Sequence, residues 1–127
     1  MARIAVVDDS RMARAFAVGA LAKAGHEAFE VEPTSLSEVM ASLRTLRPDL
    51  ILLDHMMPAF SGPSLVRACF EDSELGSVRV VMLSAHRMED LEHRMAKLGV
   101  HAVLHKPVAP GELASGVAKA LEHPSRD

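Results

Sequence analysis

Short aliphatic runs alternate with longer segments of helical periodicity along the whole chain, and this alternation constrains the fold more than any other feature. The runs cover residues 3–7, 29–32, 50–53, 78–83 and 102–104. A wholly aliphatic run such as 50–53 is typical of a strand buried on both faces. The second run differs, because Phe29 and Val31 alternate with glutamates, as in an edge strand. The pattern predicts five strand–helix units and an α/β protein with a parallel sheet covered on both faces.

The longer segments carry apolar residues at steps of three and four, which is typical of helices with one buried face. In the first segment, Ser10 is expected to cap a helix that ends near Gly25. The apolar positions of that helix include Met12, Phe16, Ala20 and Leu21. The corresponding residues of the fourth segment are Met88, Leu91, Met95 and Leu98, and Gly99 ends that helix.

Size and charge exclude several classes of protein. A chain of 127 residues that is 49% hydrophobic is long enough for one buried core and is not disordered. No apolar run reaches the roughly 20 residues that cross a bilayer, and no signal peptide precedes the first run, so we expect a cytoplasmic protein. The net charge of -3 and the lack of a basic block argue against direct nucleic-acid binding.

Polar side chains follow the aliphatic runs at the points where the strands are expected to end. They are Asp8, Asp9, Asp54, Ser84 and Lys106. In open α/β sheets the ligand crevice lies beyond the carboxyl ends of the strands, so these five side chains should converge in one pocket.

The expected pocket suits a metal ion and a phosphoryl group. Three carboxylates at close range repel one another unless a cation neutralises them, and an all-oxygen ligand set suits Mg²⁺. Lys106 and the Ser84 hydroxyl add partners for the oxygens of a transferring phosphoryl group. A carboxylate among them is a competent nucleophile.

The motifs around these residues resemble those of response regulator receiver domains over essentially the whole chain. The motifs are VVDDS at 6–10, LLD at 52–54 with Met57-Pro58 and Gly62 following, LSA at 83–85, and HKP at 105–107. Each motif alone is weak, but the ordered set at predicted strand ends is specific. The resemblance implies a flavodoxin-like receiver fold, a doubly wound five-stranded parallel sheet of order 2-1-3-4-5.

The resemblance also implies roles for the site residues. Asp54 would accept a phosphoryl group from a histidine kinase or a histidine phosphotransfer protein, forming an aspartyl phosphate. Asp9, Asp54 and the backbone carbonyl of Met56 would ligate Mg²⁺, and Asp8 would hold a metal-bound water. Ser84 and Lys106 would contact the phosphoryl oxygens. Such a module catalyses only its own phosphorylation and dephosphorylation, so no enzyme with a diffusible substrate is expected.

Three positions bear on how such a receiver would signal. Val103 stands where many receivers carry an aromatic residue, so the aromatic part of the usual switch is missing. Met56 and His86 occupy positions that tune the phosphoryl lifetime in the family. The Lys106-Pro107 peptide bond is expected to be cis by the same resemblance.

Other functions remain open at this point. A receiver-like scaffold that binds partners without phosphorylation is suggested by Val103 and His55. A phosphohydrolase of the haloacid dehalogenase type would need a second aspartate where this chain has Met56. A flavin or cobalamin module lacks a glycine-rich phosphate loop after the first strand. A transition-metal site at His55 and His86 lacks a close ligand spacing.

The expected organisation is one receiver domain over residues 1–122, followed by a polar tail over residues 123–127. Phosphorylation would change binding to an output protein that the sequence does not identify. A monomer and a phosphorylation-dependent dimer both fit the sequence.

Overall fold

The computed structural model describes residues 1–87 and 90–123, in which five strands and five helices alternate. The elements are β1 (Arg3–Val7), α1 (Arg11–Lys23), β2 (Glu27–Val31), α2 (Leu36–Leu46), β3 (Leu50–Asp54), α3 (Gly62–Glu71), β4 (Arg79–Ser84), α4 (Leu91–Leu98), β5 (Ala102–His105) and α5 (Pro110–Glu122). All strands begin and end within two residues of the predicted positions. None of these helices is both long and apolar enough to cross a membrane.

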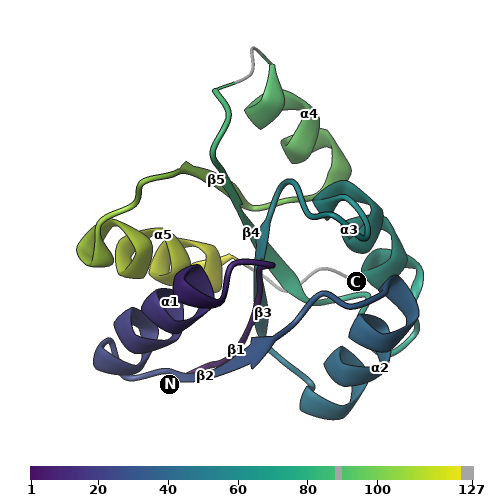
Figure 1. Ribbon diagram of the computed structural model, residues 1–127, viewed down its shortest axis with the longest axis horizontal. Helices are drawn as coiled ribbons and strands as arrows, with labels where there is room; N and C mark the ends of the chain where they lie inside the picture. Colours follow the sequence, from purple (N-terminus) through teal and green to yellow (C-terminus); the bar gives the residue numbers. More distant parts are fainter. Residues whose placement is uncertain (88–89, 124–127) are drawn as a thin grey trace.

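The five strands form one parallel sheet in the order β2-β1-β3-β4-β5, so the predicted fold is confirmed (Figure 1). All five residues of β3 are buried, as its aliphatic sequence predicts for a central strand. In the register, Val7 pairs with Leu53, and Asp54 pairs with Leu83. The carboxyl ends of β1, β3 and β4 therefore lie side by side.

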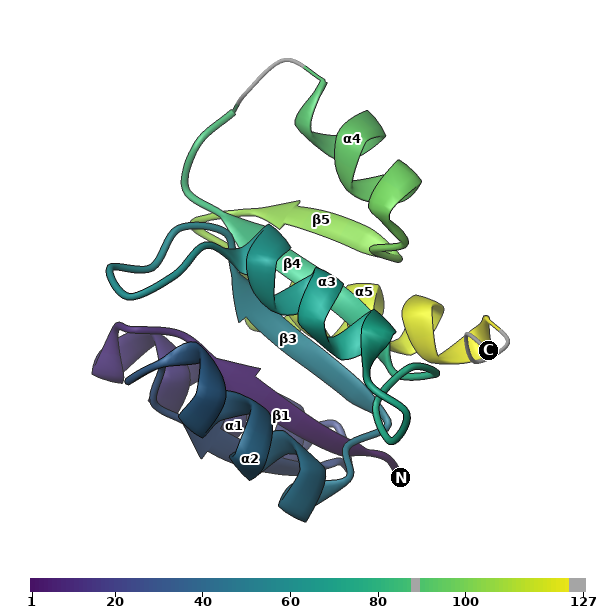
Figure 2. The same cartoon turned by 90° about the vertical axis from the view of Figure 1, so that its right-hand side faces the viewer.

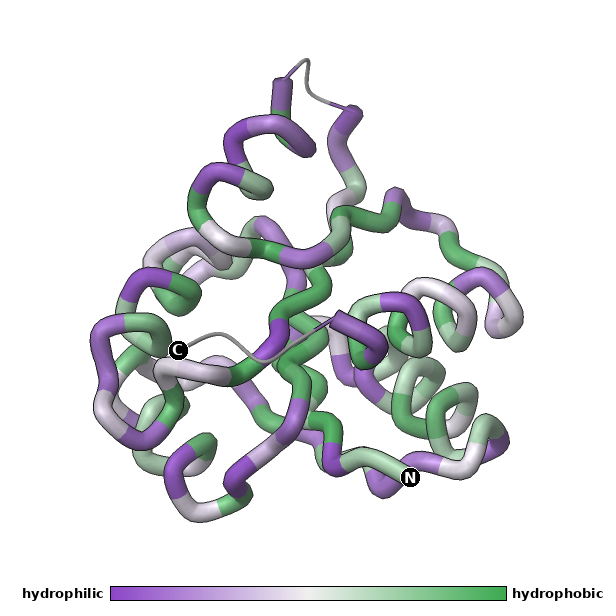
Figure 3. The backbone as a smooth tube through the Cα atoms, turned by 180° about the vertical axis from the view of Figure 1, so that it is seen from behind, coloured by the Kyte–Doolittle hydropathy of each residue, from purple (hydrophilic) through white to green (hydrophobic). Residues whose placement is uncertain are grey.

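Helices cover both faces of the sheet, with α1 and α5 on one face and α2, α3 and α4 on the other (Figures 1 and 2). Alternate residues of β3 serve the two layers, because Ile51 and Leu53 join the core under α2–α4 while Leu50 and Leu52 join the core under α1 and α5. Hydrophobic residues accordingly concentrate along the central strands (Figure 3). This arrangement leaves the loops at the carboxyl ends of the strands free to form a site.

The prediction for the fourth helix is confirmed within the described residues. Leu91 and Met95 are buried on α4, and Leu98 is half-buried. Gly99 ends the helix with a φ of 110°, a left-handed conformation that glycine adopts without a steric penalty. Met88, also predicted for this face, lies outside the described residues.

The apolar positions of the first helix are buried only toward its carboxyl end, where Leu21 is fully buried and Ala20 is half-buried. Met12 and Phe16 are exposed, at 84% and 45% of their surface, and the buried residues of α1 are Arg14, Ala17 and Leu21. The face of α1 that packs on the sheet therefore includes Arg14, whose Nη1 makes a buried hydrogen bond to the Asp8 carbonyl. An apolar pattern alone does not predict a buried arginine.

Candidate functional site

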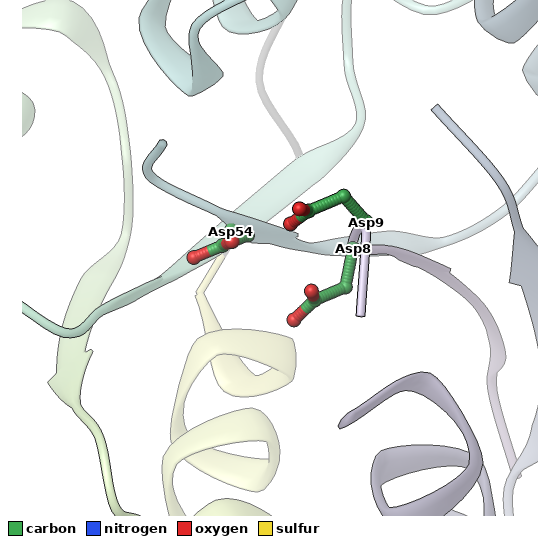
Figure 4. A group of neighbouring side chains, drawn as sticks. All are labelled: Asp8, Asp9 and Asp54. Atoms are coloured by element: carbon green, nitrogen blue, oxygen red, sulfur yellow. The ribbon is translucent and has the colours of Figure 1, made fainter. Parts of the chain in front are cut away.

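Three carboxylates meet at the carboxyl ends of β1 and β3. Asp8 and Asp9 directly follow β1, and Asp54 is the last residue of the neighbouring strand β3. One carboxylate oxygen from each residue lies within 4.8 Å of the other two. Asp8 and Asp54 are buried, whereas Asp9 is exposed, and the side chains come from two adjacent strands (Figure 4). The sequence-based expectation that these three residues converge is met.

Lys106 lies at the same pocket, after the end of β5. Its Nζ donates a hydrogen bond to Asp8 Oδ2 at 3.1 Å and lies 3.4 Å from Asp54 Oδ1. The Lys106-Pro107 peptide bond is cis, as expected. Burial by itself lowers the pKa of Lys106, but the hydrogen bond to Asp8 and the charges of Asp54 and Asp8 outweigh it and raise that pKa. The lysine is therefore a fixed positive charge beside two carboxylates.

The negative charge at this pocket exceeds what Lys106 neutralises. Burial raises the pKa of Asp54 from 3.8 to about 6, and the charge of Asp8 adds to the rise, although Lys106 opposes it. A second cation beside Lys106 would stabilise the ionised form of Asp54. Three carboxylate oxygens around one space match the hard, all-oxygen ligand set that Mg²⁺ prefers, so the residues present fit this ion.

Hydrogen bonds fix Asp8 from several directions. Its Oδ1 accepts from the backbone N–H of Ser10 at 2.9 Å, and Ser10 Oγ accepts in turn from Ala13 N–H at 3.2 Å as the cap of α1. The Asp8 carbonyl accepts from Arg14 Nη1 at 2.7 Å. Arg14 was not among the predicted site residues, because a single arginine within a helical pattern gives no signal of burial.

Ser84 reaches the pocket, but its hydroxyl is engaged elsewhere. The residue is fully buried at the end of β4, and its carbonyl accepts from Lys106 N–H at 2.8 Å. The Ser84 hydroxyl donates to the His86 carbonyl at 2.9 Å and accepts from the His86 N–H at 3.1 Å. The structure thus brings Ser84 to the correct strand end without a hydrogen bond to Asp54.

The loop after Asp54 folds back tightly on the acceptor strand. Met56 pairs with Ser61 in an isolated antiparallel bridge, and Met56 is 56% exposed. Gly62 N–H donates to the His55 carbonyl at 2.8 Å. A Cβ at Gly62 would lie 2.8 Å from the Asp54 carbonyl oxygen, so only glycine allows α3 to begin this close to the acceptor.

The histidines near the acceptor do not form a metal centre in the part of the chain that the structure describes. There, the one group of three or more possible ligands is the aspartate cluster. His55 is buried, and its Nδ1 has no hydrogen-bond partner among the described residues. Burial lowers the pKa of His55, and the nearby charges of His86 and Arg94 add to this effect. Val103 is half-buried against the core under α2–α4.

An apolar groove of about 590 Å³ borders the pocket. Its lining includes Met12, Phe16, Ala85, Lys106, Pro107 and Val108. The exposed apolar residues of α1 thus face the loops that follow β4 and β5. Lys106 belongs to both the groove and the acidic pocket.

The parallel sheet and the acidic pocket at its edge together indicate the class of signalling protein to which the chain belongs. Residues 4–118 match the response regulator receiver domain family, and the chain belongs to this family. It is accordingly part of a two-component system, and its acidic pocket is consistent with a phosphoacceptor.

Individual relatives agree with this assignment. The phosphate regulon transcriptional regulatory protein PhoB of Pseudomonas aeruginosa is 34% identical over 118 residues, which cover 93% of this chain and 51% of the relative. Protein PilH of the same organism is 30% identical over 108 residues, 85% of this chain and 88% of PilH. The chemotaxis response regulator CheY4 of Vibrio cholerae aligns with a TM-score of 0.84 and 26% identity, covering 94% of this chain and 98% of that one. The chain spans about half the length of PhoB, 51%.

Proposed function

We propose that Asp54 accepts a phosphoryl group from a phosphohistidine of a histidine kinase or phosphotransfer protein, and that phosphorylation changes binding to an output partner. One observation carries this proposal. The buried Asp54 carboxylate lies within 4.8 Å of two further carboxylates and 3.4 Å from Lys106 Nζ. A nucleophile, a cation site and a fixed positive charge are the parts that phosphoryl transfer requires.

The proposed reaction is a displacement at phosphorus. An oxygen of the Asp54 carboxylate forms a bond to phosphorus while the bond between phosphorus and the donor's imidazole nitrogen breaks. The imidazole keeps the electron pair of that bond and leaves neutral, because its other nitrogen carries a proton. The pKa of Asp54, about 6, leaves most of this carboxylate ionised at neutral pH and therefore nucleophilic.

The other residues of the pocket would bind Mg²⁺ and the phosphoryl oxygens. Asp9, Asp54 and the Met56 carbonyl would hold Mg²⁺, with Asp8 holding a water of that ion. The bound ion would neutralise charge on the carboxylates and the phosphoryl oxygens. Lys106 would donate to a phosphoryl oxygen from its position beside Asp54. Ser84 would donate to another after its hydroxyl leaves the His86 backbone.

The apolar groove supports a protein as the phosphoryl donor. Met12 and Phe16 expose apolar surface beside Lys106, and such a patch is typical of a protein-binding site. A donor protein bound over Phe16 and Val108 would lie next to Lys106 and therefore beside the acidic pocket. We further propose that the receiver domain spans residues 1–122 and acts in the cytoplasm, and that residues 123–127 form a tail.

Phosphorylation can be tested with a small donor and intact mass. The protein is incubated with acetyl phosphate and Mg²⁺, with and without EDTA, beside the variants Asp54→Asn and Asp49→Asn. Asp49 is the matched control, because it is exposed and precedes the same strand at its opposite end. We expect a Mg²⁺-dependent gain of one phosphoryl group in the wild type and in Asp49→Asn but not in Asp54→Asn.

A phosphohistidine donor follows if acetyl phosphate is ineffective. No gain in mass with either donor would overturn the proposal and favour a scaffold that binds partners without phosphorylation. Equal gain in Asp54→Asn would assign the phosphoryl group to another residue.

A further inference from the structure

Arg14 is a buried charged residue that connects three elements next to the acidic pocket. Its Nη1 donates to the carbonyl of Asp8 at 2.7 Å, and its Nε donates to Glu30 Oε1 at 3.2 Å. The Arg14 side chain is 9% exposed, whereas that of Glu30 is 46% exposed. The guanidinium therefore ties α1 to the end of β1 and to the edge strand β2.

The burial and the two contacts of Arg14 are typical of a rigid structural support for the backbone and not of a surface ion pair. A buried guanidinium is stable only when its donors are satisfied, and a hydrogen bond from a charged donor is stronger than a neutral one. The planar fork of arginine can hold the Asp8 carbonyl and Glu30 at the same time, whereas a lysine ammonium on a flexible stem holds such a pair less well.

The hydrogen bond from Arg14 holds the peptide group between Asp8 and Asp9, two of the three residues of the acidic cluster. The Asp8 side chain is already fixed by Ser10 N–H at 2.9 Å and Lys106 Nζ at 3.1 Å. The Asp9 carboxylate is exposed and accepts no hydrogen bond from the described residues, so the Asp8–Asp9 backbone is what holds Asp9 near the other two carboxylates. Holding the Asp8 carbonyl therefore fixes the backbone from which the Asp9 side chain extends toward the cluster.

We propose that Arg14 is a positioning residue of the metal site, which holds the Asp8–Asp9 backbone so that both carboxylates face Asp54. This inference rests on the proposed Mg²⁺-dependent function. Arg14 acts through Asp8 and touches neither the ion nor the phosphoryl group.

A purely electrostatic role predicts the opposite result. The positive charge of Arg14 opposes the arrival of a cation, so its removal alone would tighten Mg²⁺ binding. Loss of a support that orients metal ligands weakens binding, typically by about 10-fold to 100-fold. The sign of the change in Mg²⁺ affinity distinguishes the two roles.

The test compares Arg14→Met and Arg14→Lys with Arg3→Met. Arg3 is a control with the same kind of contacts at the other end of the sheet, because it donates to the Leu46 carbonyl at 2.7 Å and to Glu27 of β2 at 2.8 Å. The Mg²⁺ dissociation constant is measured by isothermal titration calorimetry. Hydrogen exchange of the Ser10 amide is measured in the metal-free protein.

We expect Arg14→Met to weaken Mg²⁺ binding by about 10-fold or more and to speed exchange of the Ser10 amide. Arg14→Lys should recover part of the affinity, and Arg3→Met should bind Mg²⁺ like the wild type. If Arg14→Met does not fold, Arg14→Lys carries the test, because a role of charge alone predicts wild-type affinity for it.

Unchanged or tighter Mg²⁺ binding in the Arg14 variants would overturn the inference, and so would equal weakening in Arg3→Met. Failure of the proposed function is distinguishable, because the wild type itself would then neither bind Mg²⁺ nor gain a phosphoryl group.

Discussion

Replacing Asp54 by asparagine should stabilise the metal-free protein at neutral pH. The pKa of Asp54 is raised from 3.8 to about 6, first by burial and then by the charge of Asp8. The folded state therefore holds the proton of this carboxyl more tightly than the unfolded state. The stability that Asp54 contributes is fully present below pH 3.8 and is lost as the pH rises through about 6.

The size of the effect follows from the shift. A difference of about two pKa units corresponds to roughly 3 kcal/mol, and the solvent that reaches the pocket reduces this to about 1 to 2 kcal/mol. The asparagine side chain carries no charge at any pH. The free energy of unfolding of Asp54→Asn, relative to wild type, should thus rise by about 1 to 2 kcal/mol between pH 3.5 and pH 7.5.

Urea unfolding followed by far-ultraviolet circular dichroism measures this difference, since the chain has no Trp and no Tyr for fluorescence. The titration is run in EDTA at four pH values from 3.5 to 7.5 and repeated at pH 7.5 with saturating Mg²⁺. Mg²⁺ should reverse the order, because an ion that binds only the folded wild type stabilises it. A difference between the two proteins that is constant with pH would refute the electrostatic reasoning.

Three further substitutions test other parts of the site. Phe16→Asp should abolish phosphoryl transfer from a phosphohistidine protein but leave the rate with acetyl phosphate unchanged, because it alters the groove and not the acceptor; equal loss with both donors would contradict a docking role. Gly62→Ala should lower the free energy of unfolding by about 1 to 3 kcal/mol in urea titrations, whereas Gly111→Ala, which has open space for a methyl group, should not. Lys106→Met should raise the pKa of Asp54 further, because Lys106 lowers it; carboxyl NMR titration in EDTA measures this, and an unchanged pKa would argue against the contact.

The sequence predicts the fold and the acidic cluster for the same physical reason. Aliphatic runs bounded by polar residues predict buried parallel strands, and the carboxyl ends of such strands meet at one edge. Asp8, Asp54 and Lys106 each follow such a run. Their convergence therefore needs only the order of strands, although Asp8 and Lys106 are 98 residues apart.

The details that the sequence misses depend on contacts between elements. The buried face of α1 includes Arg14, which donates to Asp8 after β1 and to Glu30 of β2, and an apolar pattern within one helix contains no information on these contacts. The direction of the Ser84 hydroxyl likewise depends on the path of the following loop. The roles assigned to Ser84, Met56 and His86 in phosphoryl binding and lifetime stay predictions.

The hydroxyl of Ser84 carries a single hydrogen, and in this structure the His86 carbonyl accepts it. A phosphoryl oxygen on Asp54 can accept a hydrogen bond from the Ser84 hydroxyl only if the hydrogen bond to the His86 carbonyl breaks. The phosphoryl group and the present conformation of the loop therefore compete for the same hydrogen-bond donor. A partner that binds the loop in its present conformation would disfavour phosphorylation. Phosphorylation would weaken binding of that partner by the same free energy.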